Sequence, residues 1–513
     1  MMIPFVATTV QDLLQALPNG GLRCVSDSRK VGVGDVFVAW PGTANDGRAY
    51  VQTAFEAGAA WALVEVDGID AFAGQAWFQD ARVIRVQGLQ SLCGPWLEAY
   101  HQSPTQHVHM LAVTGTNGKT SLAWWLSHAF TAVGRSCGMV GTLGVGLPGA
   151  YQSTGMTTPD PMVLQDLLGS LRQQQAWGCA IEASSIGIEE KRLDGITVNT
   201  VVFTNFTQDH LDYHHSMDAY WQAKRKLFEM PGVRVAVVNV DDPMGQRLTG
   251  QLRYRRGLDL WTYGVGRDDA RLSAHHVATT AQGMCFECVE RNIQGQEVSR
   301  QVVAWPAFGW HNVSNALAVL ATMRAHEVSW QQALGVCAQL PAVPGRMERV
   351  RVANDATLPL VVVDYAHTPD ALRQALLSLQ PWAENRRGQL WCVVGCGGDR
   401  DRTKRPLMAQ MAQRMAGRCV FTSDNPRTES PNAILQDMVA GLSHLERVEI
   451  IENRAQALAH AIEQAQPQDV VLLAGKGHET TQEIQGVKHP FADLQVAQEL
   501  LLARSTQTRE VRA

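Results

Sequence analysis

The residues of this chain that are best placed to do chemistry lie in one short loop, Gly115-Thr116-Asn117-Gly118-Lys119-Thr120. Loops of this type bind phosphate groups: backbone N–H groups surround the phosphate oxygens, the lysine neutralises their charge, and the threonine hydroxyl binds Mg²⁺. A strict P-loop would have its first glycine at Val113, so this loop is a variant of that pattern. All six loop residues are predicted to bind ATP together with Mg²⁺.

The elements around the loop support this interpretation. The loop follows the apolar run 109–113 and precedes a helical pattern from Ser121 through Ala132. A strand, a glycine loop and a helix in this order form a phosphate site, because the free N–H groups at a helix N-terminus attract anions. The sequence therefore predicts that the loop lies at the end of a strand and opens a helix.

Acidic and imidazole side chains follow two further apolar runs. Glu182 comes directly after residues 178–181, and His210 lies in the polar segment after residues 201–203. A carboxylate and a neutral imidazole near ATP phosphates suit Mg²⁺. Taken alone, each segment is as typical of a capped loop with solvated charges as it is of a metal site. The neighbouring glycine loop is the feature that favours the metal site.

A helical pattern over residues 217–228 carries three consecutive basic residues, Lys224, Arg225 and Lys226. From their spacing alone, these side chains are predicted to form the solvent-exposed face of an amphipathic helix. His214, which lies just before this helix, is predicted to be structural.

Four apolar runs separated by helical patterns, 358–364, 390–395, 419–422 and 470–474, indicate parallel strands with crossover helices. Ligands bind at the carboxyl ends of such strands, and each run is followed by a polar segment. Arginine can bind a carboxylate, whereas aspartate and glutamate can bind an ammonium group. Together these segments predict a site for a zwitterion, although each alone is also typical of a turn.

Composition excludes some classes of protein. The 513 residues exceed one typical core and predict about two to four domains. A net charge of -5 gives no basic excess to neutralise nucleic acid. The N-terminus lacks a signal-peptide pattern, no long apolar run occurs, and the ten cysteines are scattered. We therefore expect a cytoplasmic protein that binds small molecules, with no nucleic-acid partner and no membrane insertion. Cys285 and Cys288 are predicted to be structural residues of a strand.

Taken in order, the motifs of the chain resemble those of the Mur ligase family. The resemblance rests on Asp27-Ser28-Arg29, Asp46-Gly47-Arg48, the loop 115–120, Thr157-Thr158-Pro159, Glu182-Ala183-Ser184-Ser185, residues 343–348 and Asp424-Asn425-Pro426-Arg427. It implies an α/β protein of three domains. Residues 1–105 would bind a UDP-substrate, residues 106–342 would form a central P-loop-type ATPase sheet domain, and residues 343–513 would form a C-terminal Rossmann-like α/β domain that binds an amino acid.

The resemblance also implies an activity. The family's ligases form amides at the cost of ATP, and the motif at 424–427 is similar to that of members that add meso-2,6-diaminopimelate to the D-glutamate of UDP-N-acetylmuramoyl-L-alanyl-D-glutamate, through an acyl phosphate, in peptidoglycan synthesis. Arg427 could pair with the distal carboxylate, which lysine lacks. L-lysine as the substrate, and a folylpolyglutamate-synthase-like ligase, are the alternatives; a nucleotide-binding module without turnover is a third. We expect a monomer.

Individual roles are implied by matching positions. Lys224 resembles a lysine that forms a CO₂-derived carbamate, whose negative charge would help to hold a second metal ion. The implied catalytic residues are Lys119, Glu182, His210 and Lys224, and the implied Mg²⁺ ligands are Thr120, Glu182, His210 and the Lys224 carbamate. The implied nucleotide contacts beyond the loop are Asn312, Asn315, Arg346 and Asp364. Those for the UDP-substrate are Ser28, Thr157, Thr158, Ser184, Glu190 and Arg192, and those for diaminopimelate are Arg400, Asp424, Asn425, Pro426, Arg427, Gly475 and Glu479.

Glu190 departs from the family pattern, in which glutamine is usual at this position. A carboxylate beside an anionic substrate is unfavourable unless it is protonated or turned toward Arg192.

Overall fold

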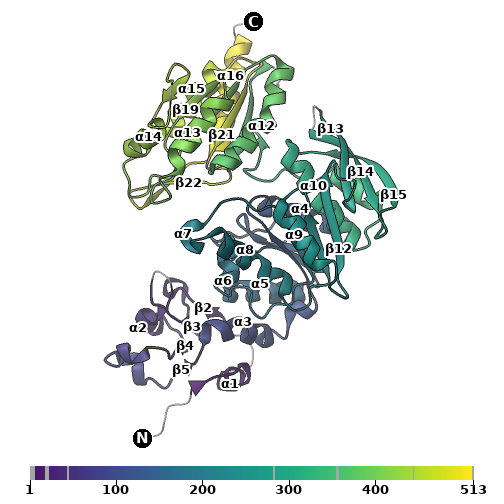
Figure 1. The fold of residues 1–513 in the computed structure, drawn as a ribbon. Coiled ribbons are helices and arrows are strands. Elements are labelled where there is room, and N and C mark those ends of the chain that lie inside the picture. Colours follow the sequence, from purple (N-terminus) through teal and green to yellow (C-terminus); the bar gives the residue numbers. More distant parts are fainter. Residues whose placement is uncertain are drawn as a thin grey trace. The chain divides into compact units, whose positions relative to one another are not determined.

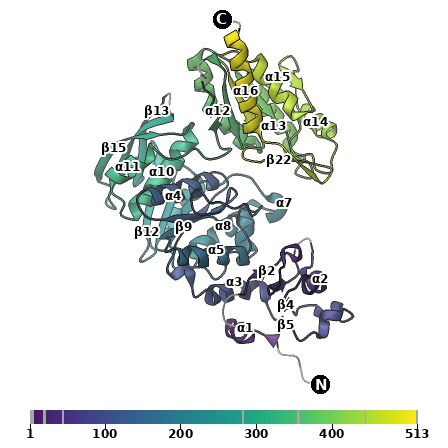
Figure 2. The same ribbon diagram turned by 180° about the vertical axis from the view of Figure 1, so that it is seen from behind.

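The computed structural model describes residues 6–17, 22–42, 45–280, 283–353, 357–442 and 444–510. The chain divides into two compact units, one of residues 1–262 with 321–328 and one of residues 263–320 with 329–513. Figures 1 and 2 show the α/β architecture of both from opposite sides. Within the described ranges, no helix is long and apolar enough to cross a membrane.

The first sheet is parallel, in the order β1-β5-β4-β3-β2. Successive strand residues point to opposite faces: Val36 and Val38 pack with α1 and α3, whereas Phe37 and Ala39 pack with α2. The sheet is therefore buried on both sides, as parallel sheets usually are. Its elements are β1 (Val6–Ala7), α1 (Val10–Ala16), β2 (Cys24–Val25), β3 (Val36–Ala39), α2 (Val51–Glu56), β4 (Trp61–Glu65), β5 (Val83–Val86) and α3 (Leu89–Tyr100).

The second sheet has the order β15-β14-β13-β12-β11-β10-β6-β9-β7-β8 within the described residues. Its strands are β6 (His109–Thr114), β7 (Cys137–Gly141), β8 (Gly144–Gly146), β9 (Gly178–Glu182), β10 (Thr200–Phe203), β11 (Val235–Asn239), β12 (Asp259–Val265), β13 (Leu272–Thr280), β14 (Gly283–Arg291) and β15 (Glu297–Trp305). Its helices are α4 (Lys119–Ala132), α5 (Pro161–Gln173), α6 (Ser185–Glu189), α7 (Leu211–His214), α8 (Met217–Lys226), α9 (Pro243–Leu252), α10 (Trp310–Ala325) and α11 (Trp330–Cys337).

Strand β6 lies between β10 and β9 and is parallel to both. Its residues Met110 to Val113 are fully buried, because α4 packs on β6, β7 and β9 while α5, α8 and α9 contribute to the core of the opposite face. The predicted strand, loop and helix at 109–132 are thus confirmed. The predicted strand that contains Cys285 and Cys288 is also confirmed, as β14.

The third sheet has the order β16-β17-β21-β18-β19-β20, and β17, β21, β18 and β19 are parallel. The prediction that the four apolar runs form parallel strands is thus confirmed. Val362 packs with α12 and α13 and Val361 with α15 and α16, and the two views place α13 and α16 on opposite faces (Figures 1 and 2). The elements are β16 (Glu348–Arg349), β17 (Leu360–Asp364), α12 (Pro369–Arg386), β18 (Leu390–Val394), α13 (Lys404–Met415), β19 (Arg418–Phe421), α14 (Pro431–Val439), β20 (Val448–Ile450), α15 (Arg454–Gln464), β21 (Val470–Ala474), the hairpin β22 (Thr481–Ile484) with β23 (Val487–Pro490), and α16 (Asp493–Glu510).

Asp160 joins the first sheet region to the second. Its Oδ1 accepts from Val163 N at 3.0 Å and caps α5, and its Oδ2 accepts from Ser26 Oγ at 3.1 Å. We predict that Asp160→Ala lowers the free energy of unfolding by about 1 kcal/mol, because the first turn of α5 loses its cap. Urea titration followed by circular dichroism measures this loss. Asp160→Asn should stay within a few tenths of a kcal/mol of the original chain, since asparagine caps as well as aspartate; an equal loss in both variants would contradict the role of the cap.

Candidate active site around the phosphate loop

The phosphate loop fills the gap between the end of β6 and the start of α4. Gly115 has φ +145° and Gly118 has φ +89°, conformations that residues with a side chain rarely adopt. A Cβ atom at Gly115 would lie 1.9 Å from Thr204 Oγ1. Position 115 therefore requires glycine both for its backbone angle and for the close approach of Thr204.

Residues after β10 hold this loop in place. Thr116 N donates to Asn205 O at 2.8 Å, and Asn117 N donates to Asn205 Oδ1 at 2.8 Å. Thr204 Oγ1 donates to Asn117 O at 2.6 Å, and Thr207 N donates to Thr116 Oγ1 at 2.9 Å. Thr204 and Asn205 were not predicted from the sequence as supports of the loop; their only signal was their position directly after a strand.

We predict that Gly115→Ala weakens nucleotide binding and lowers the free energy of unfolding. The backbone strain alone costs about 1–3 kcal/mol, and the contact with Thr204 must also be relieved by moving the loop. Calorimetric titration with ATP, together with urea unfolding, measures both effects.

Gly134→Ala is the matched control, because Gly134 has φ +82° but open space around its missing Cβ. This control should lose stability through strain while keeping its affinity for ATP. If Gly115→Ala bound ATP as tightly as Gly134→Ala, the close packing at position 115 would not matter for the loop.

Glu182 is joined to the loop by Thr120. Thr120 Oγ1 donates to Glu182 Oε2 at 2.8 Å, and Thr142 N donates to Glu182 Oε1 at 2.7 Å. The glutamate is 1% exposed. Gly141 leaves room for it, since a Cβ there would lie 2.2 Å from Glu182 Oε1. The structure thus brings together the two predicted oxygen ligands and adds Thr142, which no sequence pattern indicated.

Lys224 points inward from α8 and not toward solvent. It is 1% exposed, its Nζ donates to Gly115 O at 2.8 Å, and the same Nζ lies 4.4 Å from the centre of the Tyr220 ring. Burial, followed by the charge of Lys119, lowers the pKa of Lys224 well below its usual value, while Asp209 opposes the shift. The amine of Lys224 is therefore far more easily deprotonated than that of an exposed lysine.

The prediction from spacing is wrong for Lys224 and right for its neighbours. Arg225 pairs with Glu229 at 2.8 Å and Lys226 with Glu189 at 2.7 Å, and both basic side chains are partly exposed. Lys224 shares one face of α8 with the buried Tyr220, one helical turn earlier, and it is from this face that Lys224 reaches the loop.

His210 lies at the start of α7 with φ +52°, and its Nε2 is 3.4 Å from Asp209 Oδ2. Its side chain is 41% exposed. In the described part of the chain, no three His, Cys, Asp or Glu side chains are grouped so as to hold a metal ion. His214 is buried with its Nε2 2.9 Å from Ser185 Oγ, as expected of a structural residue.

The paired threonines connect the substrate candidates to Glu182. Thr157 Oγ1 lies 3.0 Å from Thr142 Oγ1. Thr158 Oγ1 donates to Glu182 O at 2.7 Å and lies 2.9 Å from Ser184 Oγ. A hydroxyl network thus runs from the metal candidate Glu182 to the candidates for the UDP-substrate.

Arg192 and Glu190 bind each other. Arg192 Nε donates to Glu190 Oε2 at 3.0 Å, and Arg192 Nη1 donates to Thr158 O at 2.7 Å. The departure at position 190 is therefore accommodated in one of the two ways expected from the sequence, by turning the acid toward Arg192.

The first sheet region supplies Ser28, which opens the short 3₁₀ helix Ser28–Lys30 and is partly buried. Asp27 accepts from Arg29 N at 3.1 Å and caps this turn. In the second motif, Arg48 is buried and bonds Asp46 at 2.7 Å and Asp67 O at 2.5 Å. Asp46 and Arg48 therefore shape the backbone of this region.

The second unit holds the other nucleotide candidates. Asn312 Nδ2 donates to Phe308 O at 2.7 Å, and Asn315 Nδ2 donates to Asn312 Oδ1 at 3.0 Å, both near the start of α10. Asp364 accepts from Met347 N at 2.7 Å and from Ala366 N at 2.9 Å. Burial raises the pKa of Asp364, while Arg346 opposes that shift. The Arg346 guanidinium lies over the Tyr365 ring at 4.5 Å.

The amino-acid candidates gather after β18, β19 and β21 of the third sheet. Asn425 Nδ2 donates to Glu479 Oε2 at 2.7 Å, and a Cβ at Gly475 would lie 2.4 Å from Asp424 Oδ2. Arg427 has φ +52°, and its Nη1 donates to Gly398 O at 2.6 Å. Pro426 stands between these residues, and Arg400 Nη1 donates to Asp399 O at 3.2 Å on an exposed turn.

Arg454 ties two of these strand ends together. Its Nη2 donates to Ala474 O at 3.0 Å and its Nη1 to Ser423 O at 3.4 Å, and these carbonyls directly precede Gly475 and Asp424. A fully buried ion pair with Asp493 holds the guanidinium in place.

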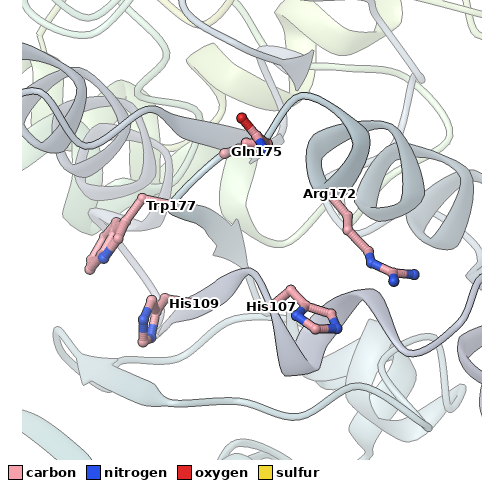
Figure 3. A pocket seen from close by; sticks show the side chains of 6 residues that line it. His107, His109, Arg172, Gln175 and Trp177 are labelled. Carbon is pink, nitrogen blue, oxygen red and sulfur yellow. The ribbon is translucent and has the colours of Figure 1, made fainter.

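A surface pocket of about 500 Å³ lies elsewhere in the first unit. Figure 3 shows its lining side chains, which are His107, His109, Arg172, Gln175, Ala176 and Trp177. His109 begins β6 and Trp177 directly precedes β9. This pocket is therefore at the amino end of β6, whereas the phosphate loop is at its carboxyl end.

Comparison with known proteins gives consistent matches along the chain. The Mur ligase middle domain matches residues 113–323, and the Mur ligase, glutamate ligase domain matches residues 345–477. A protein of Acidovorax sp. (strain JS42), named "UDP-N-acetylmuramoyl-L-alanyl-D-glutamate--2,6-diaminopimelate ligase", is 47% identical over 97% of this chain and 98% of its own length. A protein of the same name from Ralstonia nicotianae (strain ATCC BAA-1114 / GMI1000) is 43% identical over 96% of both chains.

A solved structure of a protein with this same name, UDP-N-acetylmuramoyl-L-alanyl-D-glutamate--2,6-diaminopimelate ligase, is similar with a TM-score of 0.64. It is 34% identical and covers 94% of this chain and 95% of its own. With both family domains matched and with relatives of this identity over nearly its whole length, the chain belongs to the Mur ligase family.

Proposed function

We propose that the protein is an ATP-dependent ligase that joins meso-2,6-diaminopimelate to the D-glutamate of UDP-N-acetylmuramoyl-L-alanyl-D-glutamate in peptidoglycan precursor synthesis. The single observation that carries the proposal is the 47% identity, over 97% of the chain, to a relative that bears this activity in its name. The residues of the phosphate loop and the motif at 424–427 supply the matching chemistry. This assignment takes precedence over a lysine-adding or folylpolyglutamate-synthase-like ligase.

The reaction requires activation, because a carboxylate is a poor acyl donor. The γ-carboxylate of D-glutamate attacks the γ-phosphorus of ATP, which releases ADP and forms an acyl phosphate. An amine of diaminopimelate then attacks the acyl carbon; the tetrahedral intermediate loses inorganic phosphate and a proton, and the amide remains. Lys119 and the loop N–H groups offset the repulsion between the two anions in the first step, which is catalysis by positioning and electrostatics.

Mg²⁺ fits the residues beside the loop. Thr120 and Glu182 present buried oxygen atoms 2.8 Å apart, and Mg²⁺ is typically bound by one or two carboxylates with waters and substrate phosphates. His210 and Lys224 as a carbamate complete the proposed ligand set. When bound, the metal ion neutralises the charge of the phosphates and holds their oxygens.

A carbamate also fits Lys224. Its lowered pKa favours the neutral amine, which is the form that attacks CO₂. The amine nitrogen bonds to the carbon of CO₂ and releases a proton, so carbamate formation places an anion at this buried position, and bound Mg²⁺ would compensate that charge. The unmodified Nζ lies beside Gly115 O, so the modified group would be close to the loop.

The proposed substrate contacts follow the two groups of residues described above. We assign the UDP-substrate to Ser28, Thr157, Thr158, Ser184, Glu190 and Arg192, and diaminopimelate to the cluster at 400, 424–427, 475 and 479. We further propose three domains with boundaries at 105/106 and 342/343, which the two family matches support, and a cytoplasmic monomer.

The decisive test is an assay of phosphate release and product mass with the purified chain, ATP, Mg²⁺, bicarbonate and the UDP-muramoyl-dipeptide. Diaminopimelate should give a tripeptide-bearing nucleotide, and lysine should give little. Product with lysine alone would transfer the assignment to the lysine-adding ligase, and no product with either amino acid would reject the proposal.

A further inference from the structure

Lys476 is a buried cation inside the amino-acid cluster. It lies two residues after the end of β21 and is 0% exposed. Its Nζ donates to Glu479 Oε2 at 2.9 Å, to Thr481 O at 2.7 Å and to Asn425 Oδ1 at 3.3 Å. An ammonium group has three N–H bonds, so these acceptors use all of them. Lys476 therefore contacts no ligand itself and acts only through its neighbours.

The contacts of Lys476 fix the orientation of the Asn425 amide. One amide atom of Asn425 faces Lys476 Nζ at 3.3 Å and Glu483 N at 2.9 Å, which can only donate, so this atom must be the oxygen. The other atom lies 2.7 Å from Glu479 Oε2 and must be the nitrogen. With both lone pairs of its oxygen occupied, Asn425 can offer a ligand only its remaining N–H.

Glu479 is held in a complementary way. Its Oε2 accepts from both Lys476 and Asn425, and its Oε1 accepts no hydrogen bond from the described residues. Its side chain is 29% exposed, so Oε1 is available to an ammonium group. The cluster therefore separates a donor side, Asn425 with Arg427, from an acceptor side at Glu479. A zwitterion needs both sides.

We propose that Lys476 is a positioning residue that sets this polarity: it makes Asn425 a donor for a substrate carboxylate and leaves one oxygen of Glu479 for a substrate ammonium. The inference rests on the proposed function, because it takes this cluster as the amino-acid site. Without the Lys476 charge, the orientation of the Asn425 amide would depend on Glu483 N and Glu479 alone, and Glu479 would be a carboxylate with a single donor left.

The test compares Lys476→Met with the original chain in steady-state kinetics for each substrate. Lys476→Met should raise the KM for diaminopimelate at least about tenfold, because charged hydrogen bonds that orient two contacts are lost. The KM values for ATP and for the UDP-substrate should stay within about twofold, since Lys476 hydrogen-bonds none of the residues that we assign to those substrates. Lys476→Arg keeps the charge and should recover part of the affinity. Lys488→Met, at an exposed lysine of β23, is the matched control and should leave all three KM values unchanged.

Circular dichroism separates positioning from a general loss of structure. A purely structural role would lower the active fraction for all substrates alike and leave the KM for diaminopimelate unchanged, and this result would overturn the inference. If Lys476→Met does not fold, Lys476→Gln, which removes the charge but keeps a donor, takes its place: a rise confined to the KM for diaminopimelate supports the inference, and no rise rejects it. If the original chain does not use diaminopimelate, the proposed function is rejected instead. This result is seen in the measurement on the original chain, before any variant is compared.

Discussion

Replacing Lys224 with alanine is expected to lower kcat of ligation by about 100-fold or more. The variant loses a charged group that lies against the phosphate loop, and single charge-stabilising groups in enzymes contribute factors of about 10²–10³. Phosphate release under saturating substrates measures the loss. Short carboxylic acids added to Lys224→Ala should restore part of the rate, because they supply the negative charge that the carbamate would carry.

Lys226→Ala is the matched control, since Lys226 lies on the same helix but pairs with Glu189 at the surface. It should retain the rate of the original chain. Mass spectrometry of the intact protein in bicarbonate gives an independent readout of carbamate formation. Turnover by Lys224→Ala at the original rate would remove Lys224 from the mechanism.

Arg427→Ala should reduce kcat/KM for diaminopimelate by a factor that corresponds to about 2–5 kcal/mol, as expected when one partner of a desolvated charge pair is removed. Affinity for ATP should be retained, because Arg427 lies in the cluster after β19 and contacts Gly398. The preference for diaminopimelate over lysine should shrink, since only diaminopimelate presents the distal carboxylate. Steady-state kinetics with both amino acids measures these changes.

Arg414→Ala removes an exposed arginine of α13 and serves as the control. Its kinetics should match those of the original chain. Because the Arg427 side chain also bonds a loop carbonyl, thermal unfolding of Arg427→Ala should be recorded alongside. Equal losses for ATP and diaminopimelate would contradict a specific role in amino-acid recognition.

Local patterns were sufficient to predict much of the fold. The apolar run before the phosphate loop became β6, and the four apolar runs of the C-terminal region became β17, β18, β19 and β21. Such runs are read reliably because strands covered on both faces are apolar throughout. Glu182 and Thr120 could be predicted as metal ligands from local patterns. Glu182 comes directly after an apolar run, and Thr120 belongs to the glycine loop.

The partners of these residues could not be predicted in the same way. Thr142 and Asn205 reach the loop region because β7, β9, β6 and β10 are neighbours in the sheet although they are separated along the chain. The prediction from spacing wrongly put Lys224 on the solvent-exposed face, because lysines in an amphipathic helical pattern are assigned to the polar face. Its burial depends on the tertiary contact with Gly115 O, which the spacing of residues on one helix does not contain.

The hydrogen bonds from Asn205 and Thr204 give the phosphate loop its shape through contacts within the protein. A loop that is already ordered by contacts within its own chain loses little conformational entropy when a ligand binds. Nucleotide affinity in this enzyme should then reflect the direct contacts with the phosphates. A substitution at Asn205 that removes the hydrogen bond from Asn117 N should weaken binding, because the loop would then lose conformational entropy each time a nucleotide binds.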